Sequence, residues 1–321
     1  MNTLTATYRI VTPMFLGDAD QKATEIRPPS VKGALRFWWR ALNWGRFRAK
    51  ASDDAAALRN LHEIEADLFG AAADEKNEKR GQSPFFIEVT HGIYERETGW
   101  PRNQTPSGYL GLGLFPMREH QQRESFKEEQ DFTITLRFRD ETNDERKRQI
   151  QDALIALNLF GGLGSRARRG FGSLALTHLN GVAYASKSKQ DYAQQVKNLL
   201  SGYELSQYLP PFTAFSKQSC LVLFNTDRSA RGAHIKLGNA YQQYRGQPSK
   251  LRGRIKAGFG LPLAGVSQER RASPLLMHIH PIGEMFQATA LYMPAIFHPN
   301  WEKVHMYVVE DFLNIGERIA L

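Results

Sequence analysis

The sequence predicts an α+β protein made of two units of similar build. The chain has 321 residues, which is enough for two domains and a sizeable core. One series of strands and helices runs from residue 3 to about residue 176, and a second begins near residue 219. We therefore divide the chain into units 1–182 and 183–321.

The first unit begins with a strand from Thr3 to Val11, in which apolar and polar side chains alternate. After a loop, Pro28-Pro29 stops the chain, and Ser30 is expected to cap a helix that runs to about Phe47. A further helix is expected over residues 53–68.

The rest of the first unit supplies three more strands and one more helix. Strands are expected from Phe85 to Thr90 and from Phe132 to Phe138, on either side of a Gly- and Pro-rich insertion that includes 100–115. A polar stretch, 71–83, is expected to be mobile. A helix over 144–160, the loop after it and a strand near 171–176 then give a ferredoxin-like order of elements with insertions.

The second unit is expected to have the same build. A polar helical region over 185–210 precedes it, and its first strand is Cys220 to Phe224. A basic region follows, then strands near 275–280 and 286–292, and a helix from about 301 to 315.

Composition narrows the class of protein. No apolar run approaches the length of a membrane span, and the first residues lack the layout of a signal peptide. The single Cys220 excludes an internal disulfide and a cysteine-based zinc site. We therefore expect a cytoplasmic protein.

The positive charge is segregated along the chain. The net charge is +9, and three windows, 27–50, 161–172 and 228–268, hold 18 of the 42 cations and none of the 33 acids. The rest of the chain is therefore net acidic. Such segregation is the electrostatic signature of a nucleic-acid partner.

The most informative stretch is a glycine-rich loop, residues 161–172, in which five residues are glycine and three are arginine. Glycine allows close approach of the backbone to a ligand, and arginine binds phosphate oxygens. We therefore take Gly162, Gly164, Arg166, Arg168 and Arg169 as candidate RNA-binding residues. The alternative is a solvated turn whose arginines serve solubility. A Walker motif is absent, so no nucleotide triphosphate site or cofactor is expected.

The first basic helix supplies a second candidate surface. Leu35, Trp38, Trp39 and Leu42 form its apolar face, and a cationic stripe lies beside that face. No acidic residue accompanies the stripe in the sequence. Together with the free N–H groups of the first turn, it is expected to contact phosphates; these residues are Ser30, Lys32, Arg36 and Arg40. The alternative is that the helix packs in the core and that its cationic side chains merely extend past the apolar face into water.

The third basic window combines cations with Tyr241, Tyr244 and Phe259, a mixture that suits single-stranded RNA. Its candidate residues are Lys236, Lys250, Arg252, Arg254 and Lys256. A solvated basic loop is the alternative.

Two further signals are weak. His278 and His280 share one face of a predicted strand, but two histidines without a third ligand are weak evidence for a metal, and no metal site is assigned. Asp18 and Asp20 lie in a loop and fit turn formation.

The first basic helix also carries a resemblance. Its segment Arg-Pro-Pro-Ser-x-Lys-Gly-x-x-Arg-Phe-Trp-Trp-Arg, residues 27–40, follows a strand that ends in Thr12-Pro13-Met14-Phe15. This pattern resembles the RAMP proteins of CRISPR systems, and among them the first RAMP subunit of the type III-B (Cmr) effector complex. The loop at 161–172 is similar to the G-rich loop of that superfamily, and 256–263 with 271–274 resembles the C-terminal half of the subunit.

The resemblance implies two ferredoxin-like (RRM-like) domains. It also implies binding of the 3′ part of a guide RNA and of target RNA, beside other RAMP subunits and without cleavage by this chain. The alternative is a metal-independent RAMP endoribonuclease that processes guide RNA, which needs a histidine as general acid or base. His234 is the only histidine within the three basic windows. A housekeeping RNA-binding protein explains the charge but not the tryptophan-rich helix.

Overall fold

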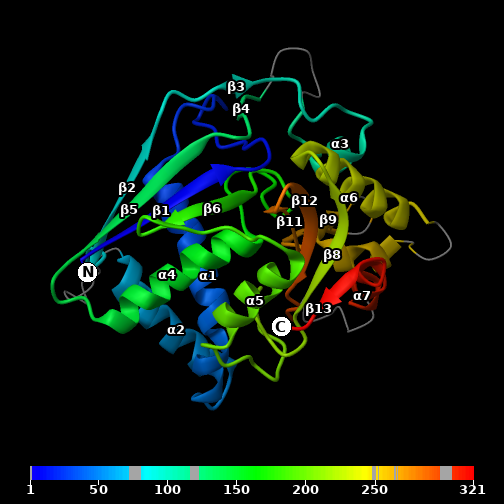
Figure 1. The fold of residues 1–321 in the computed structure, drawn as a ribbon. Coiled ribbons are helices and arrows are strands. Elements are labelled where there is room, and N and C mark those ends of the chain that lie inside the picture. The colour runs from blue at the N-terminus through cyan, green and yellow to red at the C-terminus, as the bar shows by residue number, and fades with distance from the viewer. Residues whose placement is uncertain are drawn as a thin grey trace.

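The computed structural model describes residues 2–71, 81–115, 123–247, 251, 253–263, 265, 267–296 and 306–321. Two antiparallel sheets dominate the fold, and helices pack against both (Figure 1). The predicted α+β class is confirmed. No helix among the described residues is long and apolar enough to cross a membrane.

The first sheet has five strands in the order β2-β5-β1-β6-β7. Its four longer strands follow the chain order second, third, first, fourth, which is the ferredoxin-like arrangement. Every adjacent pair is antiparallel. The strands are β1 (Thr3–Ile10), β2 (Phe85–His91), β5 (Asp131–Phe138), β6 (Leu174–Leu179) and β7 (Val182–Ala183). A separate pair, β3 (Arg96–Glu97) and β4 (Ser125–Phe126), lies beside this sheet.

Helices cover one face of the first sheet and leave the other open (Figure 1). In β1, Ala6, Tyr8 and Ile10 are buried, whereas Thr7 and Arg9 point to the open face. This alternation is what the sequence pattern predicted. The covering helices are α1 (Pro28–Ala49), α2 (Asp54–Phe69) and α4 (Asp144–Phe160).

The second sheet repeats the same order with β11-β12-β8-β13. Its strands are β8 (Cys220–Asp227), β11 (Leu275–Ile282), β12 (Met285–Tyr292) and β13 (Glu317–Ile319). Its helices are α6 (Ala230–Arg245) and α7 (Tyr307–Leu313). The remaining elements are α3 (Pro106–Leu110), α5 (Lys189–Leu200), the 3₁₀ helix η1 (Gly253–Phe259), β9 (Leu261–Leu263) and β10 (Ser267–Arg271).

Three sequence predictions need correction. The first helix begins at Pro28, with prolines in its first turn and Arg27 at the N-cap, so Ser30 is not the cap. The helical region predicted over 185–210 is helical only over α5. Within the basic region, α6 was not predicted; Ala233, Leu237 and Tyr241 form its buried face.

Two predicted segments fall partly outside the described residues. Most of the polar stretch 71–83 does so, as does the first part of the helix predicted from 301.

The hydrophobic clusters mix residues from both halves of the chain: Phe15 and Phe171 pack with Leu237 and Ile279. The division of the chain at residue 182 stays a prediction.

Candidate nucleic-acid interface

The glycine-rich loop leaves the end of α4 and folds back on itself before β6. The Leu163 N–H donates to the Gly172 carbonyl at 3.0 Å, and the Ser165 N–H donates to the Phe15 carbonyl at 2.8 Å. The loop is therefore a compact arm that is tied to the segment after β1.

The packing of the loop requires glycine at both candidate positions, Gly162 and Gly164. Gly164 has a φ of +90°, and a Cβ there would lie 2.5 Å from the carbonyl oxygen of Phe15. A Cβ on Gly162 would lie 2.5 Å from the carbonyl oxygen of Gly172. We expected these glycines to let the backbone approach RNA, but their small size already serves the folding of the loop. Their contact with RNA stays a prediction.

Arg168 connects the loop to three other parts of the chain. Its Nη1 donates to the Ser273 carbonyl at 2.8 Å and to Thr213 Oγ1 at 3.3 Å. Its guanidinium carbon lies 5.0 Å from the ring centroid of Phe37 on α1. The Met277 N–H donates to the Arg168 carbonyl at 3.1 Å. This arginine thus joins the loop to α1 and to the second sheet.

Arg169 makes a parallel set of contacts with the second half of the chain. Its Nη2 donates to the Phe259 carbonyl at 3.1 Å, and its guanidinium carbon lies 4.9 Å from the ring centroid of Tyr241. Its Nη1 is buried and has no hydrogen-bond partner among the described residues. A buried donor without an acceptor is uncommon in folded proteins, and it adds to the unsatisfied positive character of this region.

The three loop arginines differ from one another. Arg168 and Arg169 are half-buried and are held by acceptors from segments distant in sequence, whereas Arg166 is exposed and donates to the Leu112 carbonyl. The alternative of a solvated turn therefore does not fit Arg168 and Arg169.

Positive charges crowd around this loop. We call Arg123, Arg166, Arg168, Arg169 and Arg271 the arginine cluster. Burial, then the charges of Arg169 and Arg271, lower the pKa of Arg168 to about 10. Burial, then Arg169 and Arg123, also lower the pKa of Arg166. Like charges held together in a partly dehydrated setting disfavour their own protonated forms.

No carboxylate forms an ion pair with Arg123, Arg166, Arg168 or Arg169 among the described residues. An anion bound here would relieve the repulsion. Sequence reasoning missed Arg123 and Arg271 as members of this group. Each has a glutamate close by in the chain, so a count of charges along the sequence conceals them.

The cationic stripe of α1 has an acidic partner that the sequence windows did not reveal. Glu65 on α2 is buried, and its Oε1 lies 2.8 Å from Arg36 Nε and 3.4 Å from Arg40 Nη1. The premise that the stripe lacks an acid was therefore wrong for these two arginines. Their binding to RNA stays a prediction, with part of their charge already neutralised.

Lys32 keeps its charge uncompensated. No carboxylate pairs with it among the described residues, and burial, then the neighbouring Arg36, lower its pKa. The first turn of α1 offers few donors: Pro28 and Pro29 have no N–H, and the Ser30 N–H donates to the Arg27 carbonyl at 3.0 Å. The N–H groups of this turn are therefore not free as we expected, and RNA binding at Ser30 stays a prediction.

The third basic window is only partly described. Lys236 Nζ lies 2.8 Å from Asp227 Oδ2 and donates to the Thr226 carbonyl at 2.9 Å. Lys256 lies on η1. The side chains of Lys250, Arg252 and Arg254 lie outside what the structure describes. These five residues stay predictions as RNA ligands.

The three aromatic residues of that window serve the core. Tyr241, Tyr244 and Phe259 are buried in the second hydrophobic cluster, where they pack around Phe312. They are therefore not the exposed stacking surface that we expected for single-stranded RNA.

His234 is part of the same core. Its Nδ1 lies 3.1 Å from Ser107 Oγ and its Nε2 lies 2.9 Å from the Arg169 carbonyl oxygen. Burial lowers its pKa to about 4. Both ring nitrogens are committed, so His234 has the geometry of a structural residue rather than of an accessible general base.

The other signals also have local explanations. His278 and His280 are both buried, with His278 Nε2 at 3.2 Å from His280 Nδ1. Asp18 accepts the N–H groups of Asp20 and Lys22, as a turn former does. Within the described residues, no group of three or more His, Cys, Asp or Glu side chains is placed to hold a metal ion.

Sequence comparison connects this chain to known proteins. A family model described as the RAMP superfamily matches residues 7–175. CRISPR system Cmr subunit Cmr1-1 of Pyrococcus furiosus is 26% identical over 310 residues, which cover 88% of this chain and 84% of that protein. Cmr subunit Cmr1-2 of the same organism is 29% identical over 190 residues, covering 53% and 92% respectively.

Solved structures share the fold. The crystal structure of Cmr1 from Pyrococcus furiosus in its apo form matches with a TM-score of 0.68 at 23% identity, over 98% of this chain and 96% of that one. A chain of the type III-B Cmr-beta structure bound to cognate target RNA matches with a TM-score of 0.57 at 12% identity, over 98% and 99%.

Proposed function

The chain belongs to the RAMP superfamily, and we propose that it is a guide-RNA-binding structural subunit of a type III-B RNA-targeting effector complex. In this role it would contact the 3′ part of the guide RNA and the target RNA, beside other RAMP subunits in the cytoplasm. The Cmr1 relatives support the class of complex, and the type III-B Cmr-beta structure has cognate target RNA bound.

The arginine cluster is the observation that carries this proposal. The arginines of this cluster repel one another. Among the described residues, four of the five have no ion-paired carboxylate, so the chain itself does not neutralise them. Such a group favours the binding of a polyanion. Arg166 is exposed and can reach a phosphate directly. Arg168 and Arg169 are held by carbonyls and add positive potential behind it.

Lys32 is a second candidate, in the first turns of α1. The contact between Arg168 and Phe37 joins the loop to this helix. Lys32 retains an unpaired charge on the same helix, among the described residues. We therefore assign Arg166 and Lys32 as the main phosphate ligands. Arg36 and Arg40 rank below them because both are ion-paired. Arg123 and Arg271 join the loop arginines as contributors to the potential.

Binding of a short single-stranded RNA by the intact chain tests the proposal. Arg166→Ala and Lys32→Ala are expected to weaken binding about ten-fold or more each, because a charge-assisted contact contributes about 1.5–3 kcal/mol. Arg146→Ala is the matched control, since Arg146 is a partly exposed cation on α4, paired with Asp67 at 3.9 Å. Equal affinity for all four proteins would contradict the assignment. Copurification of RNA and further subunits would test the complex itself.

The rival function is a metal-independent endoribonuclease. Such chemistry needs a general base and acid that can reach a scissile 2′-hydroxyl. His234 was the only candidate within the basic windows, and it is buried with both ring nitrogens bonded. We therefore prefer binding without cleavage.

A further inference from the structure

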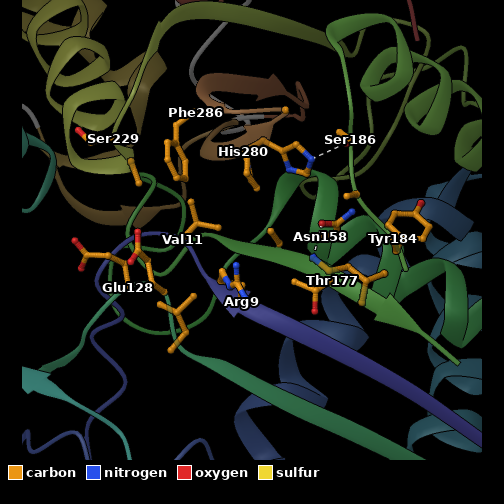
Figure 2. A pocket seen from close by; sticks show the side chains of 18 of the residues that line it. Arg9, Val11, Glu128, Asn158, Thr177, Tyr184, Ser186, Ser229, His280 and Phe286 are labelled. Carbon is orange, nitrogen blue, oxygen red and sulfur yellow. Dashed lines mark hydrogen bonds between the residues drawn. The ribbon is translucent and has the colours of Figure 1, made fainter. Parts of the chain in front are cut away.

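A cleft of about 920 Å³ lies between the two sheets, and no residue of the glycine-rich loop or of α1 lines it. The ends of β1 and β6 form one side of it, and the start of α6 with the turn between β11 and β12 forms the other (Figure 2). Its volume is at the upper end of the roughly 300–1,000 Å³ that small-ligand sites occupy. No candidate RNA residue lines it.

The inner part of the cleft is apolar and includes one aromatic ring. Val11, Ala175 and Ala230 are buried lining residues. Phe286, at the start of β12, is half-buried and projects into the space above Val11 (Figure 2). A half-buried ring at the wall of a cleft offers a face on which a planar ring can stack.

A hydrogen-bonded polar wall adjoins the ring. Ser186 Oγ lies 2.9 Å from His280 Nε2 and donates to Gln195 Oε1 at 3.2 Å. Because this hydroxyl already gives its proton to Gln195, the arrangement makes His280 Nε2 the donor to Ser186. This Ser–His pair is therefore arranged to shape the cleft, not to abstract a proton from the serine.

The neighbouring amide is also oriented. Asn158 Oδ1 accepts the Leu176 N–H at 2.7 Å, so its Nδ2 is the donor that remains. Asn158 lies beside Thr177 and Tyr184 in the cleft (Figure 2). The Thr177 hydroxyl donates to the Thr7 carbonyl at 3.1 Å, so toward a ligand it can only accept. An amide donor and a hydroxyl acceptor across the cleft from an aromatic ring match the hydrogen-bonding edge of a nucleobase.

Cations outnumber carboxylates in the lining of the cleft, where Glu128 and Glu129 are the acidic residues. Lys187 and Arg228 are exposed, and neither has an ion-paired carboxylate in the part of the chain that the structure describes. Arg231 is bonded to Glu97 and Glu128, and Arg9 pairs with Asp131 at 2.8 Å, so these two are compensated. Lys187 and Arg228 are thus the cations available to a phosphate.

We propose that this cleft binds one unstacked nucleotide, with its base against Phe286 and its phosphate at Lys187 and Arg228. A nucleotide within an RNA strand and a free mononucleotide share this chemistry. Binding of a nucleotide that is part of an RNA strand rests on the proposed RNA-binding function, whereas binding of a free mononucleotide does not.

Two substitutions with matched controls test the cleft. Phe286→Leu removes the aromatic face and keeps an apolar side chain; Phe86→Leu makes the same change at an exposed ring on β2. Arg228→Glu reverses a charge on an exposed residue that precedes the N-cap of α6, and Arg146→Glu is its control. Phe286→Tyr should restore binding. Thermal melting of each variant separates loss of binding from loss of fold, and Arg228→Glu keeps the test valid if Phe286→Leu unfolds.

A short single-stranded RNA and AMP are the two probes, each titrated against the intact chain. Phe286→Leu is expected to weaken binding about five-fold or more, since base–aromatic stacking is worth at least about a five-fold change in affinity. Arg228→Glu should weaken it as well, while both controls bind normally. If the cleft substitutions weaken the binding of RNA alone, the occupant of the cleft is a nucleotide within an RNA strand. If they weaken the binding of AMP, the occupant is a free nucleotide.

The outcomes separate this inference from the proposed function. If Arg166→Ala weakens RNA binding but the two cleft substitutions do not, and AMP fails to bind, the cleft proposal is overturned and the RNA function stands. If RNA does not bind at all, but AMP binds and Phe286→Leu weakens it, the cleft proposal stands and the RNA function fails.

Discussion

The guanidinium of Arg168 lies over the ring of Phe37, with 5.0 Å between the guanidinium carbon and the ring centroid. Arg168 belongs to the glycine-rich loop and Phe37 to the first helix, so the contact joins two of the basic segments of the chain. The same guanidinium donates to the Ser273 carbonyl, which precedes β11 of the second sheet. A residue that was expected to serve RNA alone is therefore also a structural connection.

Arg168→Ala should destabilise the fold by about 1.5–3 kcal/mol, because it removes hydrogen bonds from a charged donor and a cation–π contact. Arg166→Ala, at an exposed loop position, should change stability by about 0.5 kcal/mol or less. Urea unfolding of the two variants checks this. Equal stabilities of the two variants would show that the contacts of Arg168 do not stabilise the fold.

RNA binding should depend strongly on salt and exceed binding to duplex DNA. The slope of log affinity against log salt should be about −0.7 per phosphate contacted on a single strand. Arg166→Ala should make the slope shallower by about one such contact, whereas Arg146→Ala should leave it unchanged. Titrations over a range of salt concentrations measure both. A flat profile for the unmodified chain would contradict electrostatic binding.

Gly164→Ala should destabilise the protein more than Gly99→Ala. Both glycines have a φ of +90°, so both substitutions impose the same backbone strain of about 1–3 kcal/mol. Only at Gly164 would the new Cβ also meet a backbone atom, at 2.5 Å from the Phe15 carbonyl oxygen; nothing lies within 4 Å of that position at Gly99. Thermal melting of the pair isolates the close contact. Similar melting temperatures would mean that the loop moves away without difficulty.

Stability should fall as the pH falls below about 6.5. Burial lowers the pKa of His234 to about 4, lowers that of His278 to about 3, and holds that of His280 well below its usual value. The unfolded chain binds these protons first, near pH 6.5, so each histidine can remove up to about 1.4 kcal/mol per pH unit. For His234 the loss extends from about pH 6.5 down to about pH 4.

Urea unfolding between pH 7 and pH 5 measures this dependence. His234→Asn should lower the stability at pH 7 and flatten its dependence on pH. His62→Gln is the control, since His62 is exposed on α2, and it should keep the steep dependence. A flat profile in the unmodified protein would contradict the burial of neutral histidines.

The purified chain should not cleave labelled repeat RNA at a specific site, with or without divalent metal. The reason is that His234, the histidine of the basic windows, is buried and bonded at both ring nitrogens. Site-specific cleavage that disappears in a folded His234→Asn variant would instead support the endoribonuclease. The melting temperature of that variant shows whether it is folded.

The sequence by itself determined the local elements and their order. Alternation predicted β1 and β5, and helical spacing predicted α4 with both of its ends, because Asn143 caps its first turn and the chain turns at Gly161. The order of these elements was enough to predict the ferredoxin-like sheet. Local pattern failed at α6, where a run of cations conceals the buried face that includes Leu237.

Only the tertiary structure decided what the charged residues meet. Glu65 pairs with Arg36 from another helix, and the carbonyls that hold Arg168 and Arg169 come from residues 273 and 259. The cleft beside Phe286 likewise combines residues from both halves of the chain. Periodicity reports which side of an element is buried, but ion pairs, acceptors and cavities depend on segments that are distant in sequence. For that reason the sequence predicted where the charges lie, and the fold determined which of them are paired with other residues of the chain.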